Sequence, residues 1–180
     1  YFLSEFKMSN IEICGVEGSW IEKEELATGV LQKDIQKHNL KTKFEFSERF
    51  DLCISLEVAE HIAESEVDTY LDTLTLCSDS IIFSAAFPGQ TGQGHVNEQW
   101  PDYWISKFKT RGFEVFDFIR PAIWEEKSVR PWYKQNMLFF SKRFFVPPSV
   151  KSFNQNRIIH PETFYDLVAH YDEMKNGKWG

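Results

Sequence analysis

The order of apolar and polar positions along the chain predicts strands that alternate with helices. Four apolar runs have the length of strands and end at turn or charged residues, namely residues 11–16, 29–32, 50–56 and 80–86. When such runs alternate with segments of period 3.6, the strands are typically joined by crossover helices into a mostly parallel sheet. The pattern therefore predicts an α/β fold.

Two segments between and after these runs have helical periodicity. Apolar residues recur at i, i+3, i+4 and i+7 over residues 64–76, so they share one face of a helix. A second apolar stripe covers residues 100–108, with Pro101 in its first turn and Gly112 just past its end. We expect both helices to pack against the sheet.

The last part of the chain predicts the closing strands and an appendage. Residues 114–119 and 134–141 form two further apolar runs, and the loop-like segment between them favours an antiparallel pair at the edge of the sheet. Beyond residue 146 the apolar pattern thins, although residues 161–171 are compatible with one more helix. The sequence thus predicts one domain over residues 1–146 and a C-terminal appendage over residues 147–180.

Composition narrows the class of protein. A chain of 180 residues that is 42% apolar can bury one sizeable core, and a net charge of −7 disfavours nucleic acid as a partner. The apolar runs are too short to cross a bilayer. Cys14, Cys53 and Cys77 lack paired spacing, so we expect reduced thiols and a cytoplasmic location. The sequence does not indicate an oligomeric state.

Polar residues follow the first two predicted strands, where an open parallel sheet binds its ligand. Glu17 follows the first run, and a carboxylate there can accept both hydroxyls of a ribose while Gly18 and Ser19 approach the base. Asp34 and Ile35 follow the second run and offer a carboxylate to an exocyclic amine and an apolar wall to adenine. Each of these residues is also compatible with an ordinary turn.

A denser group of ionisable residues follows the third predicted strand. Glu57, Glu60 and His61 share one face if they form a helical turn, and they can hold a divalent ion or supply a proton acceptor. The alternative is that Glu60 and His61 only cap and hydrogen-bond the next loop. His95 follows a glycine-rich stretch after the fourth run, so it can face the same cleft.

Three stretches of the chain together resemble a known family. Residues 15–20, 50–61 and 83–100 read GVEGSW, FDLCISLEVAEH and FSAAFPGQTGQGHVNEQW. In order and spacing they resemble the class I S-adenosylmethionine-dependent methyltransferases, over residues 1–143. The resemblance implies a Rossmann-like, three-layer sheet with an antiparallel edge strand. The family begins with a strand and a Gly-x-Gly-x-Gly loop, so it also implies that the first strand is missing from this chain.

The resemblance assigns a cofactor site. It implies that Glu17, with Gly18 and Ser19 beside it, binds the ribose of S-adenosylmethionine. Asp34 and Ile35 would bind the adenine, and the turn at Leu56 and Glu57 would contact the methionine end.

The resemblance also implies a metal and a reaction. The Glu-x-x-Glu-His pattern is similar to the magnesium motif of ubiquinone-pathway and small-RNA O-methyltransferases, with Glu57, Glu60 and His61 as ligands and His95 as a further one. His61 or His95 would act as the catalytic base. The implied reaction is O-methylation of a small molecule, sugar or lipid. The alternative is a degenerate domain that serves as a non-catalytic interaction module, which would expose Trp104 instead of burying it.

Overall fold

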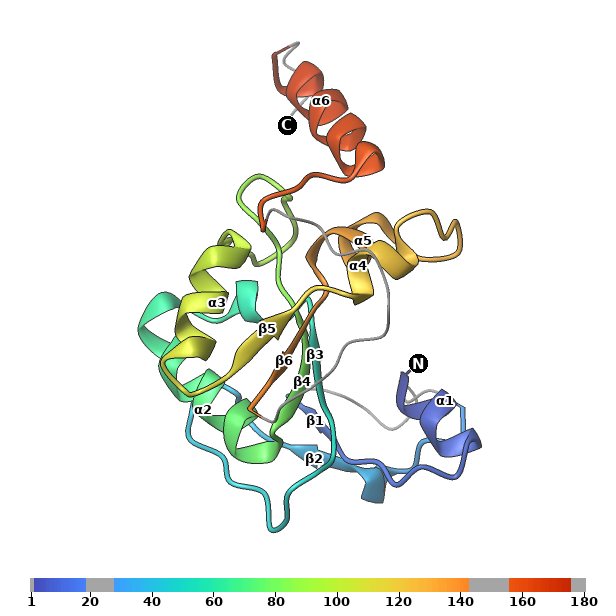
Figure 1. Cartoon of the computed structure of the whole chain (residues 1–180), viewed down its shortest axis with the longest axis vertical. Coiled ribbons are helices and arrows are strands. Elements are labelled where there is room, and N and C mark those ends of the chain that lie inside the picture. Colours follow the sequence, from blue (N-terminus) through green and yellow to red (C-terminus); the bar gives the residue numbers. More distant parts are fainter. Residues whose placement is uncertain (1, 19–27, 143–155, 176–180) are drawn as a thin grey trace.

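The computed structural model describes residues 2–18, 28–142 and 156–175, apart from the side chains of residues 172 and 174 (Figure 1). Its helices and strands, in chain order, are α1 (Phe2–Met8), β1 (Gly15–Glu17), the 3-10 turn η2 (Gln32–Asp34), β2 (Ile35–Lys37), β3 (Cys53–Leu56), the 3-10 turns η3 (Ala59–His61) and η4 (Glu64–Glu66), α2 (Val67–Cys77), β4 (Ser80–Ser84), α3 (Pro101–Lys109), β5 (Glu114–Phe116), α4 (Ile119–Ile123), α5 (Pro131–Asn136), β6 (Leu138–Ser141) and α6 (Pro161–Lys175).

The strands form two small sheets, and the predicted α/β fold is confirmed. β1 and β2 pair in parallel, and a separate four-stranded sheet has the order β3-β4-β6-β5. β3 and β4 are parallel, whereas β6 is antiparallel to both of its neighbours. The predicted antiparallel pair of closing strands, β5 and β6, is therefore present. β6 runs opposite to the other strands and lies inside the sheet, whereas β5 forms the edge.

Two predicted strands are wrong in position. Residues 29–32 contain a turn, with Gly29 at a φ of +83°, and the second strand begins only at Ile35. Asp34 accepts a hydrogen bond from the backbone N–H of Leu31 at 2.8 Å, and this bond holds the η2 turn before the strand. A short apolar run cannot by itself distinguish a strand from such a turn.

The predicted strand over residues 134–141 is half helix. Its first residues belong to α5, which begins at Pro131, and only Leu138–Ser141 form β6. Proline is favoured in the first turn of a helix because its fixed φ suits that position and its missing N–H would have no partner there. Pro131 thus indicates the start of α5 in the sequence. The apolar run that follows it hides the boundary between α5 and β6.

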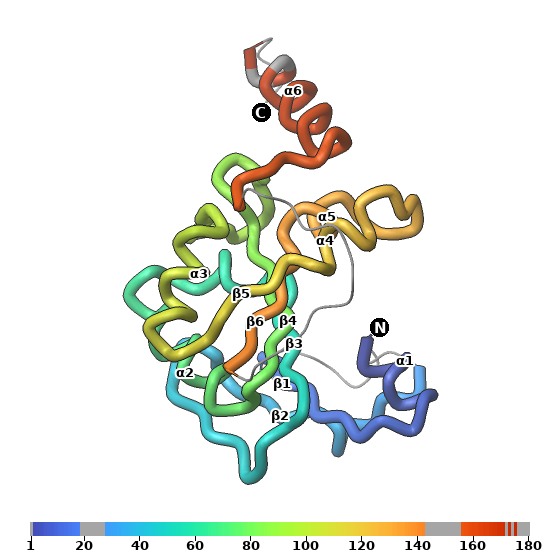
Figure 2. Tube along the Cα trace, viewed as in Figure 1, coloured from blue at the N-terminus to red at the C-terminus, as the bar shows by residue number. Residues whose placement is uncertain are grey.

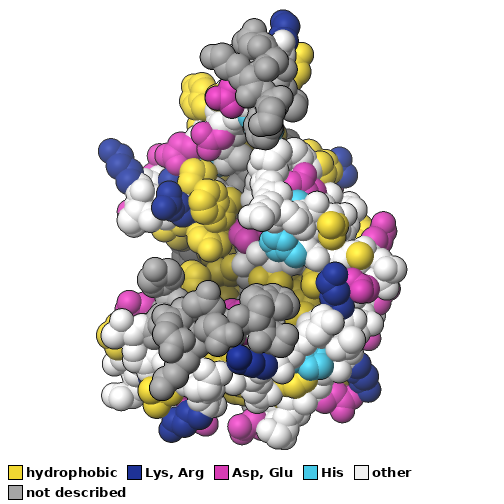
Figure 3. Space-filling model, turned by 180° about the vertical axis from the view of Figure 1, so that it is seen from behind, with side chains coloured by type: hydrophobic (Ala, Val, Ile, Leu, Met, Phe, Trp, Pro, Cys, Tyr) yellow, Lys and Arg dark blue, Asp and Glu magenta, His cyan; other side chains and the backbone are white. Residues whose placement is uncertain are grey.

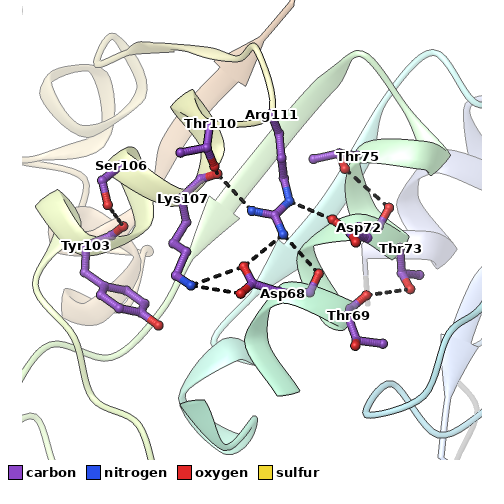
Figure 4. Close-up of polar contacts among 10 residues, drawn as sticks. All are labelled: Asp68, Thr69, Asp72, Thr73, Thr75, Tyr103, Ser106, Lys107, Thr110 and Arg111. Atoms are coloured by element: carbon purple, nitrogen blue, oxygen red, sulfur yellow. Dashed lines mark hydrogen bonds and ion pairs between the residues drawn. The ribbon is translucent and has the colours of Figure 1, made fainter. Parts of the chain in front are cut away.

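The hydrophobic core lies between the four-stranded sheet and helices α2 and α3. Trp104 is 2% exposed and Phe108 is fully buried. On the outside of this layer the two helices are linked by ion pairs, in which Arg111 binds Asp68 and Asp72 and Lys107 binds Asp68 (Figure 4). Both predicted crossover helices are therefore confirmed, and they pack as expected.

An apolar cavity of about 730 Å³ separates the two sheets. All three residues of β1 and all four of β3 line it, and each strand is paired on one side only within the described residues. Side chains of α1, among them Phe2 and Phe6, line another wall. Seen from behind, apolar side chains gather in a hollow between the lower and middle parts of the molecule (Figure 3).

The C-terminal helix α6 lies at one end of the molecule, close to α5 and to the loop after β4 (Figure 2). Just before it, the backbone N–H of His160 donates to Gln135 at 2.9 Å, and Glu162 pairs with the buried Lys134. The predicted domain boundary at 146/147 lies outside the described residues. Among the described helices, none is both long enough and apolar enough to cross a membrane.

Candidate functional site

The loops after β3 and β4 are joined at the carboxyl ends of these strands. The register pairs Leu56 with Ser84, so the two strands end side by side. The backbone N–H groups of Val96 and Asn97 both donate to the carbonyl of Glu60, at 2.9 and 3.0 Å. This backbone contact brings the predicted groups around residues 57–61 and 95–98 into one site.

Glu57 is the first residue after β3 and has an unusual backbone conformation. Its φ is +53°, which costs a non-glycine residue about 1 kcal/mol or more and tends to occur at functional sites. Its carboxylate accepts hydrogen bonds from Gln90 Nε2 at 2.6 Å and from Asn136 Nδ2 at 3.3 Å. Burial raises the pKa of Glu57, and these hydrogen bonds partly offset that effect. Glu57 is thus held by two side-chain amides. The sequence pattern placed it on a helical turn with Glu60 and His61, but it lies before that turn.

Glu60 and His95 form the buried part of the site. Glu60 is 1% exposed, its Oε1 lies 3.9 Å from His95 Nε2, and its Oε2 has no hydrogen-bond partner among the described residues. His95 Nδ1 lies 2.8 Å from Glu98 Oε1. Because a carboxylate only accepts, Nδ1 donates this hydrogen bond, and the other ring nitrogen, Nε2, faces Glu60.

Glu98 also fixes the loop that carries His95. Its two carboxylate oxygens accept the backbone N–H groups of Gly89 and Thr91, at 2.8 and 3.0 Å. A side chain at Gly92 would collide with the His95 ring, since an added Cβ would lie 2.3 Å from Nε2. The imidazole is therefore oriented from both sides.

His61 is positioned in the same way as His95. Its Nδ1 lies 3.1 Å from the carbonyl oxygen of Gly94, so Nδ1 donates this hydrogen bond. The two imidazole rings meet edge to face with centroids 5.0 Å apart. One ligand atom from each of Glu60, His61 and His95 lies within 4.8 Å of the other two.

This arrangement suits a positive charge. One nitrogen of each imidazole and one oxygen of a buried carboxyl group converge, and each imidazole is oriented by a hydrogen bond at Nδ1, much as histidines are in protein metal sites. Two imidazoles and one carboxylate are typical ligands of transition-metal ions, whereas Mg²⁺ prefers oxygen ligands alone. Of the four predicted ligands, Glu60, His61 and His95 come together, and Glu57 binds amides nearby.

The site opens into a cavity of about 490 Å³ that α6 lines on one side. Besides the predicted residues, its lining includes Trp132 at the start of α5 and Thr163, Asp166 and His170 of α6. Sequence reasoning missed these four residues. The helical pattern of residues 161–171 was the only signal, and nothing in it indicates where the helix packs.

The predicted cofactor residues divide between two places. Glu17 and Leu56 line the apolar cavity between the sheets, at the carboxyl ends of β1 and β3. Gly18 is buried beside Glu17, and Ser19 lies outside the described residues.

The premise for Asp34 and Ile35 is wrong, because Asp34 precedes β2 and Ile35 is its first residue, so neither follows the strand. Ile35 pairs with Gly15, so both residues lie at the amino ends of β1 and β2. Asp34 is engaged there by Lys7, which lowers the pKa of its carboxyl group. A ligand at the carboxyl ends of the strands lies away from both residues.

We expect the Glu60→Gln variant to be more stable than the parent protein in metal-free buffer at pH 8. Burial, and then the nearby Glu57, raise the pKa of Glu60 from 4.5 to about 7. When the pKa of a carboxyl group is raised in the folded state, the folded protein becomes less stable as the pH rises from about 4.5 to 7. The reason is that the unfolded chain releases the proton at a lower pH than the folded protein does. At about 1.4 kcal/mol per pKa unit, the gain at pH 8 is on the order of 3 kcal/mol.

Urea unfolding in EDTA at several pH values measures this gain. Glu114→Gln, which changes an exposed carboxyl group on β5, is the matched control. A gain for Glu60→Gln that stays constant from pH 4.5 to 8 would contradict the prediction.

Comparison with models of known protein families finds no match to this chain, and a search of curated proteins finds none either.

Proposed function

We propose that this protein is an S-adenosylmethionine-dependent methyltransferase that methylates an oxygen of a small acceptor, with a divalent metal ion at Glu60, His61 and His95. The observation that carries the proposal is the convergence of these three side chains at the carboxyl end of β3, inside a cavity. Open α/β sheets bind their ligands at that end of their strands.

The strand order supports a Rossmann-like fold with a missing strand. β1 and β3 each have one unpaired edge within the described residues, and both line the apolar cavity of about 730 Å³. A strand inserted there would join the two sheets in the order β2-β1-new-β3-β4-β6-β5. The order would then reverse at the new strand, which is the point where doubly wound sheets bind nucleotides. The proposed function requires a further strand at this place.

The residues of the chain have separate roles in this proposal. S-adenosylmethionine, when bound, supplies a methyl group on a sulfonium that is already activated. Glu17, at the carboxyl end of β1, accepts the ribose hydroxyls, and Leu56 packs at the carboxyl end of β3. Positioning and the exclusion of water supply most of the rate in such a transfer. α6 contributes by lining one side of the cavity.

The acceptor hydroxyl requires either an ion that lowers its pKa or a base that takes its proton. Glu60, His61 and His95 would hold the ion, which supplies a positive charge to orient a hydroxyl and lower its pKa. Nε2 of His61 or His95, with Nδ1 of the same ring already donating, can take the hydroxyl proton when it is not bound to metal.

The burial of Trp104 is evidence against the alternative function, a non-catalytic interaction module. That alternative requires the aromatic stripe of α3 on the surface, but Trp104 is 2% exposed and packs on Phe83 with ring centroids 5.3 Å apart. The stripe belongs to the core.

Calorimetric titration of S-adenosylmethionine tests the proposed function. It is performed on residues 1–180 and on a form extended through the coding sequence upstream of Tyr1, each with EDTA, Mg²⁺ or Mn²⁺. We expect the extended form to bind in the micromolar range, and Glu17→Ala to weaken binding by about 1–3 kcal/mol, as for a lost charge-assisted hydrogen bond. Absence of binding in both forms would refute the methyltransferase, and unchanged binding by Glu17→Ala would refute the ribose assignment.

A further inference from the structure

The cavity beside α6 is lined by polar groups in addition to the three side chains that we propose to bind metal. It lies between the loops after β3 and β4 on one side and α6 on the other. Thr163, at the start of α6, lines it and is 6% exposed, yet its Oγ1 has no hydrogen-bond partner among the described residues. A buried hydroxyl without a partner is unfavourable, so a ligand that hydrogen-bonds to it removes that penalty.

Charge in the cavity is acidic or neutral. Its ionisable lining consists of the carboxyl groups of Glu57, Glu60 and Asp166 and three histidines, and none of the described lining residues is a lysine or an arginine. With no metal bound, an anionic ligand such as a phosphorylated metabolite would meet like charge, and none of these residues supplies a cation to offset it. An uncharged ligand with several hydroxyl groups would instead donate to the carboxylates.

An aromatic ring completes the site. Trp132 lines the cavity wall and is 37% exposed, and the Arg130 guanidinium lies over its ring, 5.7 Å from the ring centroid. Gln90 and Thr91 add an amide and a hydroxyl. An apolar ring face with a few placed polar groups is the usual composition of a small-molecule site, and it matches a sugar, whose C–H face packs on indole while its hydroxyls bond to the polar groups.

We propose that this cavity binds an uncharged sugar ring as the methyl acceptor, packed on Trp132 and hydrogen-bonded to Thr163 and Asp166 of α6. This assignment rests on the proposed function, since it names the acceptor of that reaction. It makes α6 the element that determines acceptor specificity.

Saturation-transfer NMR tests the proposal with methyl β-glucoside, methyl β-galactoside and methyl α-mannoside, and with glucose 6-phosphate as the anionic counterpart. In EDTA, which keeps the site free of metal, we expect at least one glycoside to bind, and glucose 6-phosphate to bind at least tenfold more weakly. Trp132→Ala and Thr163→Val should each weaken glycoside binding at least fivefold, while S-adenosylmethionine binding by calorimetry stays within twofold. Tyr165→Ala, on an exposed part of α6, is the matched control and should leave both unchanged.

The two proposals fail separately. If S-adenosylmethionine binds and none of the glycosides does, or if glucose 6-phosphate binds as tightly as they do, the sugar site is refuted. If a glycoside binds in a Trp132-dependent way and S-adenosylmethionine does not bind, the methyltransferase is refuted and the sugar site stands.

Discussion

Replacement of His61 by alanine is expected to lower the turnover number by about 100-fold to 10,000-fold, which is the range for removal of a positioned acid–base or metal-binding group. S-adenosylmethionine affinity should change less than threefold. The reason is geometric, because His61 lines the cavity under α6, whereas the proposed ribose contact, Glu17, lines the other cavity. Steady-state assays with calorimetry on the same samples measure the two effects.

A second titration identifies the role of His61. If its Nε2 binds metal, Mn²⁺ affinity should fall at least tenfold in His61→Ala, because one of three converging ligands is lost. Glu64→Ala, which changes an exposed side chain just beyond the same turn, is the control for both titrations and for turnover. Equal losses of turnover and of S-adenosylmethionine affinity would contradict a role in catalysis and indicate a disturbed fold.

The group formed by Glu60, His61 and His95 illustrates which parts of the site the sequence predicts. Glu60 and His61 are adjacent, and their position after a long apolar run is typical of residues at a strand end. His95 was expected to join them because parallel strands end at the same edge. The sequence could not predict that Glu57 turns away to Gln90 and Asn136, since a left-handed φ at a glutamate has no local signal.

Short strands were the least predictable part of the fold. β1 and β2 have three residues each, so no periodicity can develop in them. The position of β2 depends on Asp34. Its carboxylate accepts a hydrogen bond from the backbone N–H of Leu31, which is close in the sequence, and forms an ion pair with Lys7, which is distant in the sequence. By contrast, α2 and α3 were predicted well, because a helix with one apolar face repeats its signal over several turns. The contact of α6 with α5 is long-range and depends on pairs such as Lys134 and Glu162.

Replacement of Phe108 by alanine is expected to destabilise the fold by about 3–5 kcal/mol, the usual cost of removing a buried phenylalanine. Phe108 is fully buried in α3 and stacks on Phe140 of β6, with ring centroids 4.2 Å apart. It also meets Phe83 and Phe113 edge to face, at 5.2 and 5.8 Å. The ring therefore joins α3 to two strands, and the cavity left behind can collapse only if these elements move.

Urea unfolding followed by tryptophan fluorescence measures this loss, and Phe164→Ala is the matched control. Phe164 is 51% exposed on α6, so its truncation should change the free energy of unfolding by no more than about 0.5 kcal/mol. A loss below about 1 kcal/mol for Phe108→Ala would mean that the aromatic layer under α3 is loosely packed. The burial of Trp104 would then no longer argue against the interaction module, because a loosely packed α3 can expose its aromatic stripe to a partner.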